Sequence, residues 1–378
     1  MIVSLVKCEE YDYDRIRGAL LRTFDNIGGI DRFVQPGDRI LLKTNLLMKK
    51  TPEEATTTNP VFVQALADIL MSKDAIVVIG DSPGGPFMEG RMKNIYKSTG
   101  MEEAAKRSGA SLNFNLASYY TEFDNAVLLN KVILTDMIND VDKIINLPKL
   151  KTHGFAVYTG AVKNLFGLIP GTIKAEYHVN MPDVNNFCNA LIDICEHVKP
   201  VLHIMDGIVG MEGAGPSGGR PRKIGAILAS ENPYDLDKTA CEIIGLKVQD
   251  VPTLRKAAER GLSSDSMEDV EIAGDRIEDV LVPDFEKAPA ISGSLRNIPL
   301  PVIKFLAKRL KSRPVFNFDI CVGCGDCAAN CPPKVIEMTE GKPVVDYVGC
   351  ISCFCCQELC PVKAIEIKKP LLSKLIFR

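Results

Sequence analysis

The sequence of 378 residues lacks several features that would point to particular classes of protein. Its four histidines are dispersed and show no HExxH spacing, which argues against a catalytic site built on one metal ion. The first twenty residues contain an acidic cluster and a helical pattern where an export signal needs a basic start and an apolar run. The formal net charge of −3 gives no reason to expect nucleic-acid binding.

Long apolar runs are also missing. The longest, such as residues 76–80, have the length of a strand, so we expect no transmembrane segment. Neither GxGxxG followed by an acid nor GxxxxGK[ST] occurs, so neither an NAD site nor a P-loop is predicted. With 46% hydrophobic and 25% charged residues, the composition is that of a globular protein, and we expect a cytoplasmic location.

Cysteine is scarce in the first 320 residues and abundant after them. Four cysteines are scattered there, whereas nine lie between positions 321 and 360. Because cytosolic thiols stay reduced, this favours metal ligands over disulfides. The change in composition predicts a division into an α/β domain, a linker with a basic helix, a cysteine-rich domain and a tail, at residues 1–280, 281–314, 315–369 and 370–378.

Short Val/Ile/Leu runs alternate with helical patterns in the first part of the chain. We expect strands at 2–6, 39–43, 75–79, 143–147, 201–205 and 224–229. We expect helices at 13–26, 59–71, 91–107, 183–197, 234–244 and 251–260. Nearly continuous apolar strands separated by helices predict an α/β fold with a mainly parallel sheet covered by helices on both faces.

The stretch LPVIKFLAKRLKSR (300–313) is predicted to form a short amphipathic helix with five basic residues and no acid. Such a helix can lie on an anionic membrane surface or on an acidic partner protein. Alternatively, it packs its apolar stripe on the α/β domain and exposes its charges, which we favour.

The cysteine-rich segment repeats itself after 29 positions. Both CVGCGDCAANCP (321–332) and CISCFCCQELCP (350–361) space their cysteines by two, two and three residues and end in proline. Zinc also binds paired CxxC elements, but it needs only four ligands and gives no reason for the third cysteine or the proline. The repeat, in which the fourth cysteine is expected to begin a helix, therefore predicts two 4Fe-4S clusters.

This segment resembles the bacterial-type two-cluster ferredoxin domain over residues 315–369. The resemblance implies a small α+β fold that transfers single electrons, in which each fourth cysteine serves the other cluster. Its implied ligand sets are Cys321, Cys324, Cys327 and Cys360 for one cluster, and Cys350, Cys353, Cys356 and Cys331 for the second. Cys355 departs from the pattern and is an alternative ligand, a redox-active thiol or a small buried hydrophobe. Oxygen-sensitive thiolates favour a reducing, anaerobic setting.

Basic and amide side chains follow the expected strands of the α/β domain. Ligands in open α/β sheets bind beyond the carboxyl ends of the strands, so these groups could converge on one carboxylate or phosphate. The candidates for this anion site are Lys43, Asn45, Lys149, Lys151, His153, Lys163 and Asn164. The alternative is that the lysines are only solvated.

Two glycine-rich stretches support this site. Residues 80–86 follow a strand and precede a helix, where backbone amides can hold an anion, and residues 206–225 are expected to form a flexible loop that closes over a ligand. Either stretch can also be a simple turn. His178, with Glu176 nearby in the sequence, is a candidate general acid or base, although this pair alone does not define a catalytic site. Asp235 and Asp237 are expected to cap the helix that follows them.

The combination of LLKTNLL, INLPKLKTH, AVKNLFGLIPG and the glycine stretch from Asp206 resembles the domain-of-unknown-function family 362 (DUF362) over about residues 35–245. The resemblance implies an iron–sulfur protein, and its matching positions are Lys43, Lys149, Lys151, Lys163 and Asn164. The family usually has Asp-Pro where this chain has Asn232 and Pro233, so a role for that turn does not follow.

Three functions remain in competition. We expect an oxidoreductase that passes single electrons from its clusters to a small anionic substrate or a redox partner. A second reading is an electron-transfer subunit whose α/β domain only docks a partner enzyme. A third possibility is an enzyme of non-redox chemistry in which the clusters are purely structural.

Overall fold

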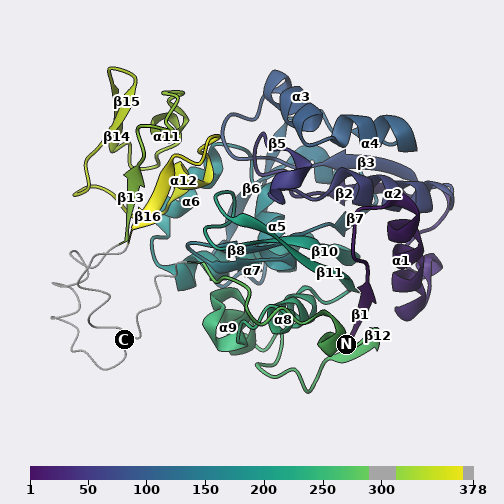
Figure 1. Ribbon diagram of the computed structural model, residues 1–378. Coiled ribbons are helices and arrows are strands. Elements are labelled where there is room, and N and C mark those ends of the chain that lie inside the picture. Colours follow the sequence, from purple (N-terminus) through teal and green to yellow (C-terminus); the bar gives the residue numbers. More distant parts are fainter. Residues whose placement is uncertain (289–311, 369–378) are drawn as a thin grey trace.

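A computed structural model describes residues 1–288 and 312–368. The first part of the chain forms a ten-stranded sheet in the order β12-β1-β11-β10-β7-β2-β3-β4, and β8 pairs with β10 and β9 (Figure 1). These strands are β1 (Ile2–Lys7), β2 (Arg39–Lys43), β3 (Ile76–Gly80), β4 (Ser111–Leu112), β7 (Lys143–Asn146), β8 (Lys149–His153), β9 (Val157–Thr159), β10 (Leu202–Glu212), β11 (Arg220–Ser230) and β12 (Glu271–Gly274). Strands β5 (Ser118–Glu122) and β6 (Lys131–Thr135) form a separate hairpin.

Most neighbours in the large sheet are parallel. Strands β4, β3, β2, β7 and β10 run in one direction, whereas β11 is antiparallel to both β10 and β1. The expected mainly parallel α/β fold is therefore confirmed, with two antiparallel strands: β11 in the middle of the sheet, and β9, which pairs with β8.

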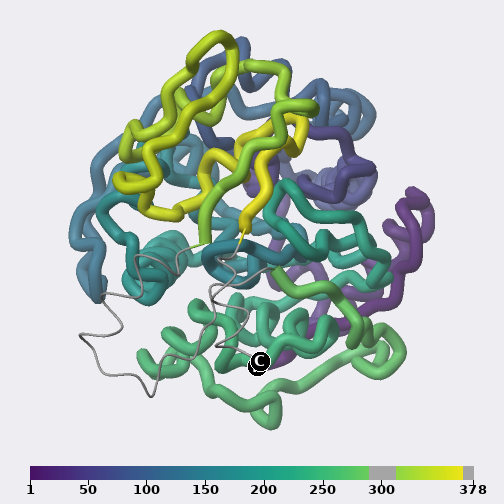
Figure 2. Tube along the Cα trace, turned by 60° about the vertical axis from the view of Figure 1, so that its left-hand side comes forward, coloured from purple at the N-terminus to yellow at the C-terminus, as the bar shows by residue number. Residues whose placement is uncertain are grey.

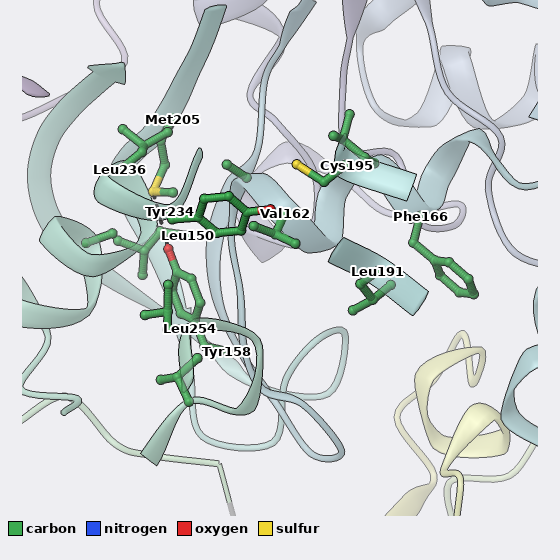
Figure 3. Close-up of a cluster of buried hydrophobic side chains, with 14 of the residues drawn as sticks. Leu150, Tyr158, Val162, Phe166, Leu191, Cys195, Met205, Tyr234, Leu236 and Leu254 are labelled. Carbon is green, nitrogen blue, oxygen red and sulfur yellow. Dashed lines mark hydrogen bonds between the residues drawn. The ribbon is translucent and has the colours of Figure 1, made fainter. Parts of the chain in front are cut away.

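Helices cover both faces of this sheet. One face carries α1 (Tyr13–Asn26), α2 (Pro60–Met71), α3 (Glu89–Ser98) and α4 (Met101–Ser108), and the other carries α5 (Ala161–Asn164), α7 (Val184–Val198), α8 (Pro233–Ile243) and α9 (Pro252–Glu259). Side chains of β2 alternate between the faces, since Ile40 and Leu42 enter one core and Leu41 the other. Figure 3 shows the second core, where the Tyr158 hydroxyl points at the sulfur of Met205.

Several short elements join these layers. Helix α6 (Ile173–Asn180) follows α5, and the 3₁₀ turns are η1 (Ile30–Arg32), η2 (Pro52–Glu54), η3 (Asp136–Ile138), η4 (Leu165–Leu168), η5 (Val248–Asp250) and η6 (Ile277–Val280). Among the described residues, no helix has both the length and the apolar character needed to cross a membrane.

Two expectations about helices are wrong. The single helix expected at 91–107 is two helices, because Gly100 takes a left-handed conformation (φ 76°) between α3 and α4. Asp235 and Asp237 lie inside α8, whose true N-cap is Asn232, followed by Pro233 at the first helical position. Asp237 instead accepts hydrogen bonds from the first backbone amides of α5.

The C-terminal unit (residues 312–368) is a small α+β structure. Strands β13 (Arg313–Phe316) and β16 (Ile365–Lys368) form one antiparallel pair, and β14 (Ile336–Thr339) and β15 (Lys342–Val345) form another. Its helices are α11 (Asp326–Ala329) and α12 (Cys355–Glu358). Most of the expected basic helix at 300–313 lies outside the described residues, as does the tail at 370–378, and Arg313 begins a strand.

Candidate functional site

Eight cysteines surround two hollows in the C-terminal unit. One hollow is lined by Cys321, Cys324, Cys327 and Cys360, and the other by Cys331, Cys350, Cys353 and Cys356. The other walls are mainly apolar, with side chains such as Phe316 and Val345. Each hollow thus combines three cysteines of one repeat with the fourth cysteine of the other. Within the described residues, no group of three or more His, Cys, Asp or Glu side chains is arranged to hold a single metal ion.

The two cysteine loops share one backbone shape. Gly323 and Gly325 have left-handed φ angles of 68° and 79°, and the residues 29 positions later, Ser352 and Phe354, have φ angles of 57° and 62°. Left-handed backbone is costly for residues other than glycine, so the second loop keeps the shape under strain. The duplication seen in the sequence is therefore also a duplication of conformation.

The short helices precede the fourth cysteines. Helix α11 contains Cys327 and α12 contains Cys356, whereas Cys331 and Cys360 come after the helix ends. The expectation that the fourth cysteine begins a helix is therefore wrong. The prolines that follow these cysteines, Pro332 and Pro361, also come after the helices have ended. The amide of Ala364 donates to the sulfur of Cys360 at 3.2 Å, a type of bond that tunes the potential of a cluster.

Helix α12 packs against the turn between β10 and β11, so the end of the C-terminal unit lies on the α/β part (Figure 2). Ser217 donates to the backbone oxygen of Glu358 at 2.5 Å, and the Gln357 amide donates to the oxygen of Ala214 at 3.0 Å. The flexible loop expected at 206–225 is wrong, because most of it belongs to the two strands and only residues 213–219 form the turn. This turn supports the C-terminal unit.

A cavity of about 100 Å³, termed the interface cavity, lies between the two parts of the chain. The α/β part contributes Asn45, Asp81, Lys151, Lys163, Asn164, Lys174 and His178 to its wall, and the C-terminal unit contributes Asn330, Cys355, Glu358 and Leu359. Four of the seven sequence candidates, Asn45, Lys151, Lys163 and Asn164, therefore come together here. Lys43, Lys149 and His153 do not line it.

The convergence follows from the topology of the sheet. Asn45 comes just after β2, and Asp81 just after β3, which is the parallel neighbour of β2. Lys163 lies on α5, and the Asn164 side chain donates to the oxygen of Asn146 at the end of β7. Carboxyl ends of parallel strands meet at one edge of a sheet, which is the usual ligand position in α/β folds.

Two candidate lysines form buried ion pairs. Lys43 lies 2.8 Å from Asp81, and Lys149 lies 2.8 Å from Asp206, with less than 5% of any of these side chains exposed. Tyr11 also donates to Asp206, at 2.7 Å. Because breaking a buried pair leaves an uncompensated charge, these lysines have a clear structural role.

Three other lysines point at the cavity without a carboxylate partner within 4 Å among the described residues. Lys151 donates to Asn45 and to the backbone oxygen of Thr56, both at 2.7 Å. Lys174 donates to Ser82 and to the oxygen of Ile169, and burial lowers its pKa to about 7. Lys163 makes only a distant contact with an aromatic ring, and burial lowers its pKa as well.

Glu358 brings one carboxylate to the cavity from helix α12. Its Oε1 lies 3.2 Å from Nε2 of His153, a contact without good hydrogen-bond geometry. Nδ1 of His153 accepts two backbone amides at 3.0 Å, which places the proton on Nε2, and burial lowers the pKa of His153 to about 4. Burial opposes ionisation of Glu358, but His153 and Lys163 outweigh it and lower the pKa of Glu358 to about 2.

Two polar groups in the cavity wall have no partner. His178 is 6% exposed and Thr159 is 3% exposed, yet Nδ1 of His178 and the Thr159 hydroxyl make no hydrogen bond within the part of the chain that the structure describes. Buried polar atoms are nearly always bonded, so this arrangement is typical of a ligand site. Glu176, which was considered together with His178, is exposed and does not line the cavity. Burial lowers the pKa of His178 to about 4.

Sequence reasoning missed Lys174, Thr159 and Glu358. Lys174 and Thr159 lie between residues 148 and 182, where no helix or strand was predicted, although the sequence TIKAEYHVN has a helical character that could have revealed α6. Glu358 sits between the ligand candidates Cys356 and Cys360, and no pattern shows that it turns toward the α/β part.

Two solved structures share part of the fold at low similarity. The lactate racemase apoprotein from Thermoanaerobacterium thermosaccharolyticum has a TM-score of 0.41 and 12% identity, over 65% of this chain and 57% of that one. A Thermotoga maritima protein has a TM-score of 0.39 and 14% identity, over 63% of this chain and 60% of that one. The chain therefore spans less than two thirds of either, and neither informs on function.

Sequence comparisons are more specific. A curated relative, the thylakoid-associated protein sll1697 of Synechocystis, is 33% identical over 268 residues, which are 70% of this chain and 81% of the relative. Residues 313–361 match the 4Fe-4S dicluster domain, which supports cluster binding and an electron-transfer role. Residues 40–242 match the domain of unknown function DUF362. The chain therefore belongs to the DUF362 family and carries a ferredoxin-type 4Fe-4S domain at its C-terminal end.

Proposed function

We propose that this protein transfers single electrons, through two 4Fe-4S clusters, to a small anionic substrate in the interface cavity. The observation that carries the proposal is the composition of the cavity wall. Asn330, Cys355 and Leu359 line the cavity, and each directly precedes a candidate cluster ligand in the chain. A substrate in the cavity would therefore lie beside both cysteine-lined hollows.

The two hollows fit 4Fe-4S clusters. Each hollow has the four cysteines of one predicted ligand set and mainly apolar walls, and the hollow that contains Cys360 also has an amide donor to the sulfur of that residue. We assign Cys321, Cys324, Cys327 and Cys360 to one cluster and Cys350, Cys353, Cys356 and Cys331 to the second. When bound, such clusters supply one-electron chemistry at potentials set by hydrogen bonds to sulfur and by burial.

The residues of the α/β part bind and orient the substrate. Lys163, which has no ion-pair partner within 4 Å among the described residues, supplies a positive charge in a partly buried cavity, where an ion pair is stronger than in bulk solvent. Asn45 and Asn164 are joined at 2.8 Å, and this bond fixes the direction of both amides. His178, with an unpartnered nitrogen, is placed to give or take a proton.

Anaerobic stopped-flow measurements on the reduced holoprotein test this proposal. We expect reoxidation by at least one small anion in a broad panel and at least tenfold slower reoxidation in Lys163→Gln. Lys247→Gln, which changes an exposed lysine, is the matched control and should behave as the wild type. If no anion reoxidises the protein, and a partner protein does so at the same rate in Lys163→Gln, the chain is the electron-transfer subunit of the alternative reading.

The same proposal places the protein in a reducing, cytoplasmic setting. The relative is described as thylakoid-associated, which is a statement about that protein. Fractionation of cells that produce the full chain distinguishes a cytoplasmic protein from one that sediments with membranes.

A further inference from the structure

The charges around the interface cavity do not balance. Three lysines, Lys151, Lys163 and Lys174, line it without a carboxylate within 4 Å in the described ranges 1–288 and 312–368. Asp81 also lines the cavity, but its charge is matched by Lys43 at 2.8 Å. Glu358 is the remaining carboxylate in the wall. When the three lysines are protonated, as a bound anion favours, three ammonium groups and one carboxylate leave an excess of two positive charges among the side chains of the wall.

The hydrogen bonds of Lys151 and Lys174 suit the protonated state, which opposes the lowering of their pKa by burial. Lys151 donates to two oxygens, and Lys174 donates to the backbone oxygens of Ser82 and Ile169. An ammonium group is a donor of three hydrogens, so a shell made of oxygen acceptors suits the charged form. Burying uncompensated charge is costly, and a bound anion removes that cost. The wall is therefore complementary to a ligand that carries about two negative charges.

The size and polarity of the cavity restrict the ligand further. Its volume of about 100 Å³ is smaller than the roughly 150 Å³ of an engineered cavity that holds benzene, so the ligand has few atoms. The unpartnered Thr159 hydroxyl and His178 Nδ1 are within the same wall and more than nine-tenths buried. They provide the neutral hydrogen-bonding groups that a small oxyanion needs beyond the lysines.

We infer that the interface cavity is a binding site for a small dianion, a molecule with two negative charges on oxygen. Lys163 and Lys174 supply the main attraction, and Thr159 and His178 complete the contacts. This inference rests on the cavity named in the proposed function and defines the class of its substrate. Dicarboxylates and tetrahedral oxyanions share this chemistry, and they differ in shape.

Calorimetric titration of the oxidised holoprotein tests the inference without any turnover. The probes are oxalate and malonate as dicarboxylates, sulfate and hydrogen phosphate as tetrahedral dianions, and acetate and nitrate as monoanions, all at one ionic strength so that screening is equal. We expect at least one dianion to bind at least tenfold more tightly than either monoanion. Lys163→Gln and Lys174→Gln should each weaken that dianion at least tenfold, while Lys247→Gln leaves its affinity unchanged.

The outcomes distinguish the two classes of dianion, and they distinguish failure of the dianion site from failure of the proposed electron transfer. Tighter binding of oxalate or malonate identifies dicarboxylates, and tighter binding of sulfate or phosphate identifies tetrahedral oxyanions; either supports the inference. Equal affinity for acetate and malonate, or variants that bind dianions as well as the wild type, would overturn it. That result leaves reoxidation by a monoanion open. Conversely, dianions that bind but never reoxidise the clusters would refute the proposed function and leave the dianion site standing.

Discussion

His153 on strand β8 and Glu358 on helix α12 lie 3.2 Å apart, so a buried contact between an imidazole and a carboxylate joins the α/β part to the C-terminal unit. His153 is fully buried and Glu358 is 13% exposed. The Nε2 proton of His153 faces the carboxylate, since its Nδ1 is occupied by two backbone amides.

Replacing this carboxylate should loosen the contact. Glu358→Gln keeps the shape of the side chain and removes the charge that faces His153 and Lys163. We expect the free energy of unfolding to fall by about 1–3 kcal/mol, the usual cost of disturbing a buried polar contact. Denaturant titration of the anaerobic holoprotein measures it. Glu366→Gln, on the exposed side of β16, is the control and should lie within about 0.5 kcal/mol of the wild type.

Substitution should affect stability differently for a lysine in a buried ion pair and for a lysine without a carboxylate partner among the described residues. Lys43→Met leaves Asp81 buried without its cation, which should cost about 3–5 kcal/mol of stability. Lys163→Gln removes a charge that has no ion-pair partner in the described residues, so stability should stay unchanged or rise. Thermal unfolding of both variants checks this, and a loss for Lys163→Gln as large as that for Lys43→Met would contradict the division.

Stability should fall as the pH drops below neutral. Burial lowers the pKa of His203 to about 3, from an ordinary value near 6.5, so the unfolded chain takes up a proton in this range that the folded chain does not. The folded state therefore loses stability as the pH falls from about 6.5 toward 3. Between pH 7.5 and 5.5 this residue should account for about 1 kcal/mol. His203→Gln should remove that share of the pH dependence in paired unfolding curves.

The first cysteine loop should tolerate no side chain at Gly323. A Cβ there would lie 2.6 Å from the backbone oxygen of Gly341, and the φ angle is already left-handed at 68°. At Gly325 the φ angle is 79°, but no atom lies within 4 Å of a Cβ. Gly325→Ala should cost about 1–2 kcal/mol from backbone strain alone. Gly323→Ala should cost more and also lower the iron content; equal effects would show that the contact with Gly341 is unimportant.

The crossed ligand sets predict a specific result for the fourth cysteines. Cys360→Ala should disturb the cluster held by Cys321, Cys324 and Cys327, whereas Cys331→Ala should disturb the other. Each variant should lose about half of its iron if one cluster remains. Electron paramagnetic resonance of the two reduced variants should give different spectra, each with one signal set. Identical spectra would argue against the assignment.

Most of the α/β fold could be predicted from the sequence, because apolar periodicity and capping residues agree with the helices and strands of the structure. Helix α1 was predicted with its observed bounds, since an apolar helical period starts directly after the capping residue Asp12. Strands β10 and β11 were predicted too short, because glycine and charged residues near their ends look like loop although pairing with each other extends them. Pairing is a long-range effect that periodicity does not report.

Four of the seven sequence candidates for an anion site line the interface cavity. Asn45, Lys151, Lys163 and Asn164 follow from the rule for strand ends in α/β sheets. The same rule selected Lys43 and Lys149, and only the packing shows that these two pair with Asp81 and Asp206. Glu358 could not be predicted, because its place in the cavity depends on how the C-terminal unit packs against the α/β part, and no sequence pattern reports that packing.

Asn330 and Leu359 occupy equivalent positions of the internal repeat, 29 residues apart, and both line the interface cavity. Each cysteine repeat gives its fourth cysteine to the hollow of the other repeat, so an approximate twofold rotation relates the two repeats. Two equivalent residues can lie close together only near the axis of that rotation. The axis of the C-terminal unit therefore passes close to the cavity. Under the proposed function, this arrangement would give each of the two clusters its own short route to a bound substrate, so that neither cluster would be the obligatory last carrier.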